Sequence, residues 1–326
     1  MYKIENNKKL IEKYIYDNYS LKPISEIKYI KHNDINSKNF IFKTSNDEYI
    51  LKFINEPQPK QKIEKIAKIL DFCIKNNCKV SKPIKNKKQS FFDSKNNAFL
   101  VKYFKGDNYS GTKSEYLNAI KSIATFHKTL AKYNETYNYK TNDKFFKIFK
   151  TNELSDISKK IKEKKSLDNF DKKVITEIEF IRSQILINNT FMDFIKTQKI
   201  KKQLIHHDLH YENMIFNNGT VSGIIDFIDL RKGYLIEDVV FAAFKFLTFS
   251  AKIKKISKKD VNSFLDEYSK YNLLSDKEKD LALSFLRKKF LSKISFILKK
   301  RYYSKADAWE VDFKKYTKNL KLIERF

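Results

Sequence analysis

The spacing of hydrophobic positions along this chain changes from a period of two to a helical period. In the first hundred residues, short runs alternate apolar and polar side chains, which is typical of strands with one buried face. We expect five strands there, at residues 24–30, 40–44, 49–54, 91–92 and 99–104. The pattern therefore predicts a small antiparallel sheet.

Helices are expected both among these strands and after them. Residues 6–19 have an apolar face, and Pro57 and Pro59 precede a helix that runs to about residue 76. Further helices are expected at residues 114–133, 143–164, 169–198, 236–252, 258–272, 276–300 and 307–324. A change of composition near residue 104 predicts an N-terminal domain of residues 1–104 and a helical C-terminal domain of residues 105–326. Together they make an α+β fold.

Residues 204–229 interrupt the helical pattern with a polar loop and two short strands. The strands flank Asn217-Asn218-Gly219, which predicts a hairpin that brings Asp208, Asn213 and Asp226 together. Oxygen ligands clustered in this way suit a hard cation such as Mg²⁺. A carboxylate beside such a cation could orient a substrate hydroxyl, so we interpret the stretch as a phosphoryl-transfer centre.

The same stretch contains three histidines that could be considered as zinc ligands: His206, His207 and His210. Protein zinc sites commonly use cysteine and histidine together, and no cysteine lies nearby. The neighbouring carboxylates and carboxamide favour a hard ion instead. We therefore expect magnesium here and interpret His206 as a support for the loop.

The net charge of +28 suits nucleic acid, an anionic membrane surface or an anionic substrate as partner. The lysines are spread along the chain, however, and Asn, Ile, Tyr and Phe are abundant with them, as an A/T-rich coding sequence would produce. We therefore expect no nucleic-acid partner, although the positive field would favour nucleotide binding.

Cysteine usage and hydropathy bear on the cellular compartment. Cys73 and Cys78 form neither a CxxC pair nor a disulfide framework. The sequence contains no run of 18 apolar residues and no apolar signal region at its start, so we expect no membrane span. A cytoplasmic protein with reduced thiols is the simplest expectation. The sequence does not indicate an oligomeric state.

Several motifs of this chain resemble one known superfamily. Residues 206–213, His-His-Asp-Leu-His-Tyr-Glu-Asn, resemble the HxDxxxxN loop of the aminoglycoside phosphotransferase, choline kinase and homoserine kinase-like phosphotransferases. Residues 224–227 are similar to the family's Ile-Asp-Phe/Trp metal motif, and residues 123–127 and 79–84 resemble two of its other segments. The resemblance implies a protein-kinase-like bilobal fold, with a small antiparallel-sheet N-lobe carrying one helix and a larger, mostly helical C-lobe.

The resemblance also implies roles for individual residues. Asp208 would accept or orient the proton of the substrate hydroxyl, and Asn213 and Asp226 would hold Mg²⁺. Phosphoryl transfer also needs a lysine at the phosphates. Lys52, in the third expected strand, is the candidate, and Glu64 on the following helix is its expected partner. Glu56 is a competing partner.

The nucleotide site would use the hinge between the lobes. Lys102, Tyr103 and Phe104 would offer backbone groups to the purine of ATP, and these residues do not distinguish ATP from GTP. The loop at residues 32–39 lacks a glycine-rich fingerprint, but its Asn and Ser residues could donate to a phosphate.

Departures from related kinases narrow the activity. Residues 226–228 lack the glycine of the protein-kinase DFG motif, no Ala-Pro-Glu follows, and His207 stands where many family members have glycine. A small-molecule kinase is therefore favoured, with a sugar or amino sugar, homoserine or a choline-like alcohol as acceptor. The lysine-rich helices after residue 250 weaken an aminoglycoside as acceptor. The alternatives are an aminoglycoside O-phosphotransferase and a non-catalytic kinase-like protein that binds nucleotide or nucleic acid.

Overall fold

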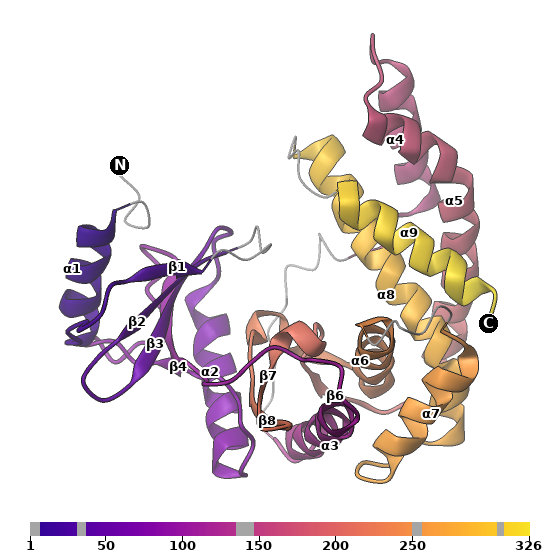
Figure 1. Ribbon diagram of the computed structural model, residues 1–326. Coiled ribbons are helices and arrows are strands. Elements are labelled where there is room, and N and C mark those ends of the chain that lie inside the picture. Colours follow the sequence, from indigo (N-terminus) through magenta and orange to yellow (C-terminus); the bar gives the residue numbers. More distant parts are fainter. Residues whose placement is uncertain (1–6, 31–36, 135–146, 250–255, 305–309) are drawn as a thin grey trace. The chain divides into compact units, whose positions relative to one another are not determined.

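The computed structural model describes residues 7–30, 37–134, 147–249, 256–304 and 310–326 (Figure 1). Its contacts divide the chain into two compact units. The first unit comprises Met1–Tyr139 with Leu204–Lys232, and the second comprises Lys140–Gln203 with Gly233–Phe326. These units are defined by contacts between residues, whereas the predicted boundary at residue 104 separates two lobes. That boundary stays a prediction.

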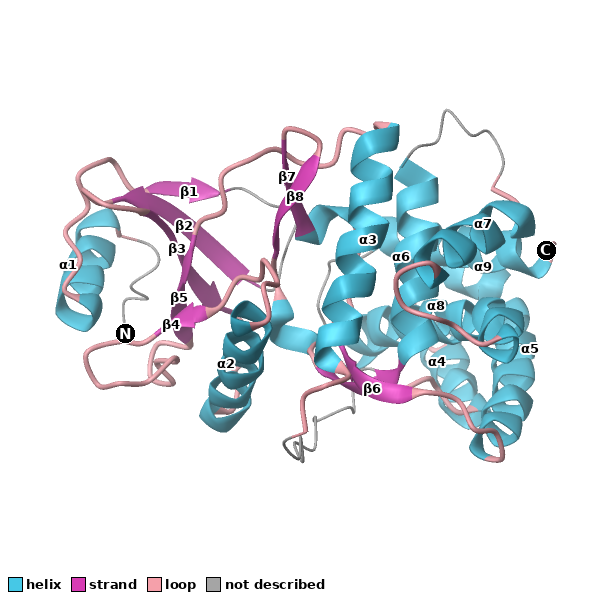
Figure 2. Cartoon of the chain, turned by 90° about the horizontal axis from the view of Figure 1, so that it is seen from below, coloured by secondary structure: helices cyan, strands magenta, loops and turns pink. Residues whose placement is uncertain are grey.

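The first unit contains a five-stranded antiparallel sheet in the order β1-β2-β3-β5-β4 (Figure 2). Its strands are β1 (Lys28–Ile30), β2 (Ser37–Lys43), β3 (Glu48–Ile54), β4 (Pro83–Ile84) and β5 (Ala98–Lys102). The predicted antiparallel sheet is therefore confirmed, with a shorter first strand than expected.

The strand expected at residues 91–92 is wrong, because the short strand β4 at Pro83–Ile84 takes that place in the sheet. Local side chains use the backbone groups of this segment instead. The amide of Phe91 donates to Glu64, and the amide of Phe92 donates to the hydroxyl of Ser90. Residues 91–92 therefore belong to a structured connection between β4 and β5.

Alternation along β3 gives the sheet two different faces. Leu51 and Phe53 are buried in a cluster with Ile11 and Tyr14 of helix α1 (Lys8–Tyr19), which covers this face (Figure 1). Each such apolar side chain contributes about 1.5–3 kcal/mol when it is fully buried. Lys52 lies between Leu51 and Phe53 in sequence, so its side chain belongs to the opposite face.

Helix α2 (Lys60–Lys75) follows β3 and ends in a left-handed cap. Asn77 has φ +63°, and the amide of Cys78 donates to the carbonyl of Cys73 at 2.9 Å. This pattern is the Schellman motif, in which the two residues joined by that bond also make an apolar contact. It accounts for the burial of both cysteines at the end of α2, where both are free thiols.

The first unit is completed by helix α3 and by the segments that hold the predicted site. Their bounds are α3 (Lys113–Leu130), the 3₁₀ turns η2 (Tyr211–Asn213) and η3 (Phe227–Asp229), and strands β7 (Met214–Asn217) and β8 (Thr220–Ile224). Strands β6 (Lys202–Ile205) and β9 (Arg231–Tyr234) pair with each other where the chain passes between the units.

The second unit is helical over its described residues outside β6 and β9. Its helices are α4 (Thr151–Lys162), α5 (Asn169–Lys196), α6 (Leu235–Phe249), α7 (Lys258–Ser269), α8 (Asp276–Tyr303) and α9 (Glu310–Glu324). Capping boxes begin α5, α7 and α8 and satisfy their first amides. The predicted α+β class is confirmed. Residues 143–146, 250–252 and 307–309, which were also expected to be helical, lie outside the described residues.

The described helices include none that is both long and apolar enough to cross a membrane.

Candidate active site

The predicted hairpin is confirmed, and its two-residue turn accounts for two residues with positive φ. Strands β7 and β8 pair from Met214 with Ile224 to Asn217 with Thr220, which leaves Asn218 and Gly219 as the loop. Both loop residues have positive φ, +48° and +73°, as a type I′ turn requires. The side-chain amide of Asn118 in α3 donates to the Gly219 carbonyl at 2.9 Å and fixes the tip of the hairpin.

The segment after β5 is bonded along this hairpin. Asp107 and Phe216 exchange two backbone hydrogen bonds, of 2.7 and 2.9 Å. Gly106 has φ +145°, and a Cβ there would lie 2.1 Å from the Phe216 carbonyl oxygen. A Cβ at Gly223 would lie 2.5 Å from the ring of Phe104. Glycine at both positions therefore lets the predicted hinge approach the hairpin closely.

A third segment fixes the end of β8. The amide of Ser81 donates to the Ile224 carbonyl at 2.9 Å, and the amide of Ile224 donates to the Lys79 carbonyl at 2.8 Å. Because residues 79–81 directly follow the capped end of α2, these bonds tie that helix to the strand that leads to Asp226.

His206 joins the two loops of the predicted centre, as its expected supporting role requires. Its ring is fully buried, and Nδ1 accepts the amide hydrogen of Asp208 at 3.3 Å. The proton of a neutral ring must then reside on Nε2, which donates to the Ile225 carbonyl at 2.9 Å. Both ring nitrogens are used in this way, so neither can bind zinc.

Asn213 is oriented by the loop that it closes. Its side-chain nitrogen donates to the backbone carbonyl of Asp208 at 2.9 Å, and its backbone carbonyl accepts from the backbone amide of Ile225 at 3.0 Å. The first bond leaves Oδ1 as the atom of this amide that can bind a cation. Asn213 is 9% exposed.

Lys52 and Asp226 form an ion pair at 2.8 Å between Nζ and Oδ1, although they are 174 residues apart in sequence. Their side chains are 14% and 32% exposed. Burial acts to raise the pKa of Asp226, but the charge of Lys52 and its hydrogen bond outweigh this effect, so the pKa lies below its ordinary value. Asp226 is therefore ionised at neutral pH.

The Asp208 side chain is 27% exposed and lies beside His210, whose Nε2 is 3.4 Å from Oδ2. His210 Nδ1 in turn lies 3.2 Å from Glu212 Oε2. The sequence predicts His210 only as a possible zinc ligand, not as a neighbour of the Asp208 carboxylate. Its position two residues after Asp208 in a tight loop was the signal that it would contact this carboxylate.

His207 has a structural explanation that its sequence position did not reveal. Its φ is +71°, in the left-handed region that glycine adopts without strain. The side chain is 3% exposed, and its Nε2 contacts the guanidinium of Arg231. His207 therefore makes a backbone turn that glycine would make without strain. Among the described residues, no group of three or more His, Cys, Asp or Glu side chains could hold a metal ion.

The remaining predicted nucleotide residues lie in the first unit. Glu64 Oε1 accepts from the Ser90 hydroxyl at 2.7 Å and from the Phe91 amide at 2.9 Å, so its carboxylate is directed at this segment. Lys102 Nζ pairs with Asp47 at 2.6 Å. The hinge was expected to offer backbone groups to a purine, but one of them, the amide of Tyr103, donates to the Glu48 carbonyl at 2.9 Å. Residues 32–36 of the predicted phosphate loop lie outside the described residues, and residues 37–39 belong to strand β2 and not to a loop.

Comparison with known proteins identifies the kind of fold that holds this site. The family model described as "phosphotransferase enzyme family" (APH) matches residues 26–274. No match was found among curated proteins.

Solved structures match over nearly the whole chain. Amicoumacin kinase hAmiN in complex with AMP-PNP and Ca²⁺ matches with a TM-score of 0.68 and 14% identity, over 97% of this chain and 94% of that one. Spectinomycin phosphotransferase in complex with ADP and spectinomycin matches with a TM-score of 0.67 and 12% identity, also over 97% of this chain and 94% of that one. Choline kinase LicA from Streptococcus pneumoniae matches with a TM-score of 0.63 and 15% identity, over 98% of this chain and 99% of that one. At these identities the likeness shows the fold, so the predicted protein-kinase-like fold is confirmed.

Proposed function

The chain belongs to the phosphotransferase enzyme family, and from this premise we propose that it transfers the γ-phosphate of ATP to a hydroxyl of a small molecule. The observation that carries the proposal is the Lys52–Asp226 pair beside the loop of Asp208 and Asn213. Phosphoryl transfer depends mainly on positioning and on neutralising charge, and these side chains supply both functions.

Mg²⁺ is the cation that this donor set fits. Asn213 Oδ1 and the ionised carboxylate of Asp226 are hard oxygen ligands, and both come from segments that His206 holds together. When bound, the ion would neutralise charge on the nucleotide phosphates. The structure of hAmiN was determined with Ca²⁺, another hard cation.

The protein side chains would divide the remaining work. We propose that Lys52 donates to the phosphates and that Asp208 accepts the proton of the attacking hydroxyl, with its carboxylate positioned by His210. Glu64 could orient Lys52 only if its carboxylate gave up the hydrogen bond from the Ser90 hydroxyl and accepted one from the Lys52 ammonium group instead. Lys102, Tyr103 and Phe104 remain the proposed purine contacts, apart from the Tyr103 amide, and they do not select ATP over GTP.

The acceptor is proposed by class. The structural neighbours include an antibiotic phosphotransferase and a choline kinase, so the family resemblance allows either kind of alcohol. The second unit carries lysine-rich helices such as α8, which disfavour a polycationic aminoglycoside. We therefore propose a sugar, amino sugar, homoserine or choline-like acceptor. Because the proposed reaction uses ATP, which is present in the cytoplasm, we propose that the protein acts there.

A panel of alcohols monitored by ADP release tests the proposal. We expect one acceptor class to raise ADP release above the rate without acceptor, and Asp208→Ala to abolish this increase. Asp17→Asn, a change of one exposed carboxylate on α1, should leave it unchanged. If no acceptor raises the rate of the wild type above that of Asp208→Ala, the protein is a non-catalytic nucleotide-binding member of the fold.

A further inference from the structure

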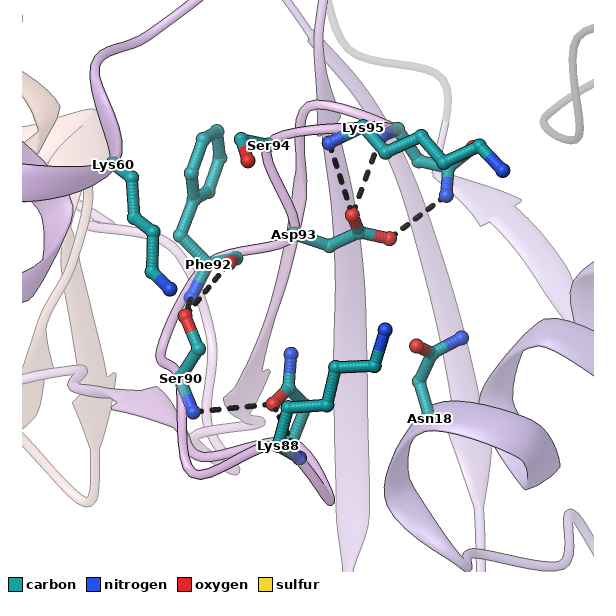
Figure 3. A pocket seen from close by; sticks show the side chains of 10 residues that line it. Asn18, Lys60, Lys88, Ser90, Phe92, Asp93, Ser94 and Lys95 are labelled. Carbon is teal, nitrogen blue, oxygen red and sulfur yellow. Dashed lines mark hydrogen bonds between the residues drawn. The ribbon is translucent and has the colours of Figure 1, made fainter.

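A polar cavity of about 400 Å³ lies in the first unit (Figure 3). It is bounded by the end of α1, the start of α2 and the connection between β4 and β5, and its lining includes Asn18, Lys60, Lys88 and Lys95. Figure 3 shows Lys88 reaching between Asn18 and Asp93, with Lys60 and Lys95 on two other sides of the same space. Small-molecule sites commonly have volumes of roughly 300–1,000 Å³.

This cavity is separate from the proposed phosphoryl-transfer centre. Asn18 belongs to α1, and α1 covers the face of the sheet that carries Leu51 and Phe53. Lys52 points from the opposite face, where it pairs with Asp226. None of the residues that line the cavity is among those proposed to bind the nucleotide or the metal.

The walls of the cavity are ordered by bonds within the connection. The side chain of Asn86 accepts from the amides of Lys88 and Ser90, at 3.0 and 3.1 Å. The buried hydroxyl of Ser90 lies within hydrogen-bond distance of two acceptors, the Glu64 carboxylate at 2.7 Å and the Phe92 carbonyl at 2.8 Å. These bonds fix the segment that carries Lys88 before any ligand binds, which lowers the entropy lost on binding.

The charge of the cavity is positive. Three lysines line it against one carboxylate, that of Asp93. That carboxylate is already engaged, since it accepts from the Tyr14 hydroxyl and the Asn96 side-chain amide, both at 2.8 Å, and from the Lys95 amide at 3.0 Å. Within the described part of the chain, the ammonium groups of Lys60, Lys88 and Lys95 pair with no carboxylate. They are available to an anion.

We propose that this cavity binds a small phosphorylated molecule. Lysine is a common point-charge partner of phosphate, and a phosphate offers enough acceptor oxygens for several ammonium groups together with the amide of Asn18. The volume exceeds what a single phosphate needs, and it fits a diphosphate or a phosphate ester of a small alcohol.

Residue-resolved titration tests the site on the full chain. Sodium pyrophosphate is added to ¹⁵N-labelled protein at constant ionic strength, and amide shifts are followed. We expect saturable shifts of the amides of residues 86–96 and of Asn18. Replacing Lys60, Lys88 and Lys95 together by Gln should raise the dissociation constant read from these amides at least about tenfold, because charge-assisted bonds are lost.

A control variant separates a built site from general attraction. Lys9, Lys13 and Lys68 are exposed lysines of the same unit that do not line the cavity, and replacing all three by Gln removes the same charge. We expect the dissociation constant of this variant to stay within about twofold of the wild type, because screened charges at a distance contribute little. The proposal is overturned if the amides of residues 86–96 do not shift, or if both variants weaken binding equally. It is also overturned if succinate binds as tightly as pyrophosphate.

Discussion

The two loops of the proposed centre, residues 206–213 and 225–229, each contain a non-glycine residue in a left-handed conformation and use it differently. His207 has φ +71° and is buried against Arg231. Asp226 has φ +64°, and its partly exposed carboxylate bonds to Lys52. Such a conformation costs about 1–2 kcal/mol in a residue with a side chain. In the first loop the strain turns the backbone that carries Asp208, and in the second it aims the strained side chain itself.

This difference indicates that His207 supports the backbone, whereas Asp226 takes part in the proposed chemistry. The first loop needs a turn at 207, which glycine or histidine can make, whereas the second loop needs a carboxylate at 226 because only a charged group pairs with Lys52. Asp and Asn tolerate the left-handed region better than other side chains. Position 226 is therefore limited both by its backbone and by its charge.

The largest effect is expected from Asp226→Asn. Asparagine accepts the same backbone but loses the charge that pairs with Lys52 and would bind the cation. We expect the rate of ADP release with the best acceptor to fall at least about a hundredfold, as when a charge-stabilising group is removed from an active site. Circular dichroism should show a folded protein. A wild-type rate would mean that both left-handed residues are structural.

His206→Leu should affect stability more than any change at His207. It leaves the Asp208 amide and the Ile225 carbonyl buried without their ring partners. Each unsatisfied group costs about 1–3 kcal/mol, so we expect the free energy of unfolding to fall by about 2–6 kcal/mol in urea denaturation. His206→Gln, which can keep one of the bonds, should lose less. Equal losses in the two variants would show that packing of the ring, not its bonds, joins the loops.

The smallest effect is expected from His207→Gly. The variant relieves the left-handed strain but loses the contact with Arg231 and makes the unfolded chain more flexible. We expect the free energy of unfolding to change by less than about 1 kcal/mol, because these effects oppose each other. ADP release should stay close to the wild-type rate. A loss of activity comparable to that of Asp226→Asn would assign His207 a role in the chemistry.

Local sequence patterns predicted the features that depend on neighbouring residues, such as turns and strand faces. The Asn218-Gly219 pair predicted the hairpin turn, and alternation along β3 predicted the face of Lys52. The pairing of Lys52 with Asp226 depends on segments far apart in the chain, and alternation alone does not define it. The strand expected at residues 91–92 failed for a related reason, since Glu64 of α2 takes the backbone bond that a strand would need.

Two features of the molecule could be explained only from its backbone geometry. The histidine at 207 had no explanation in sequence, because the φ of a residue depends on the loop around it. The lysine-lined cavity combines α1, α2 and the connection after β4, and the ten residues that line it are spread from Asn18 to Asn96. Their types alone resemble an ordinary solvated surface.

The division of labour between the loops is tested most directly by a Mg²⁺ titration of ADP release. Asn213→Ala removes a proposed metal ligand, so we expect it to raise the Mg²⁺ concentration for half-maximal rate and to recover activity at high Mg²⁺. Asp208→Asn should lower the rate at every Mg²⁺ concentration without shifting the midpoint. If Asp208→Asn shifts the midpoint and Asn213→Ala does not, the proposed assignment of Asp208 to the acceptor and Asn213 to the metal is contradicted.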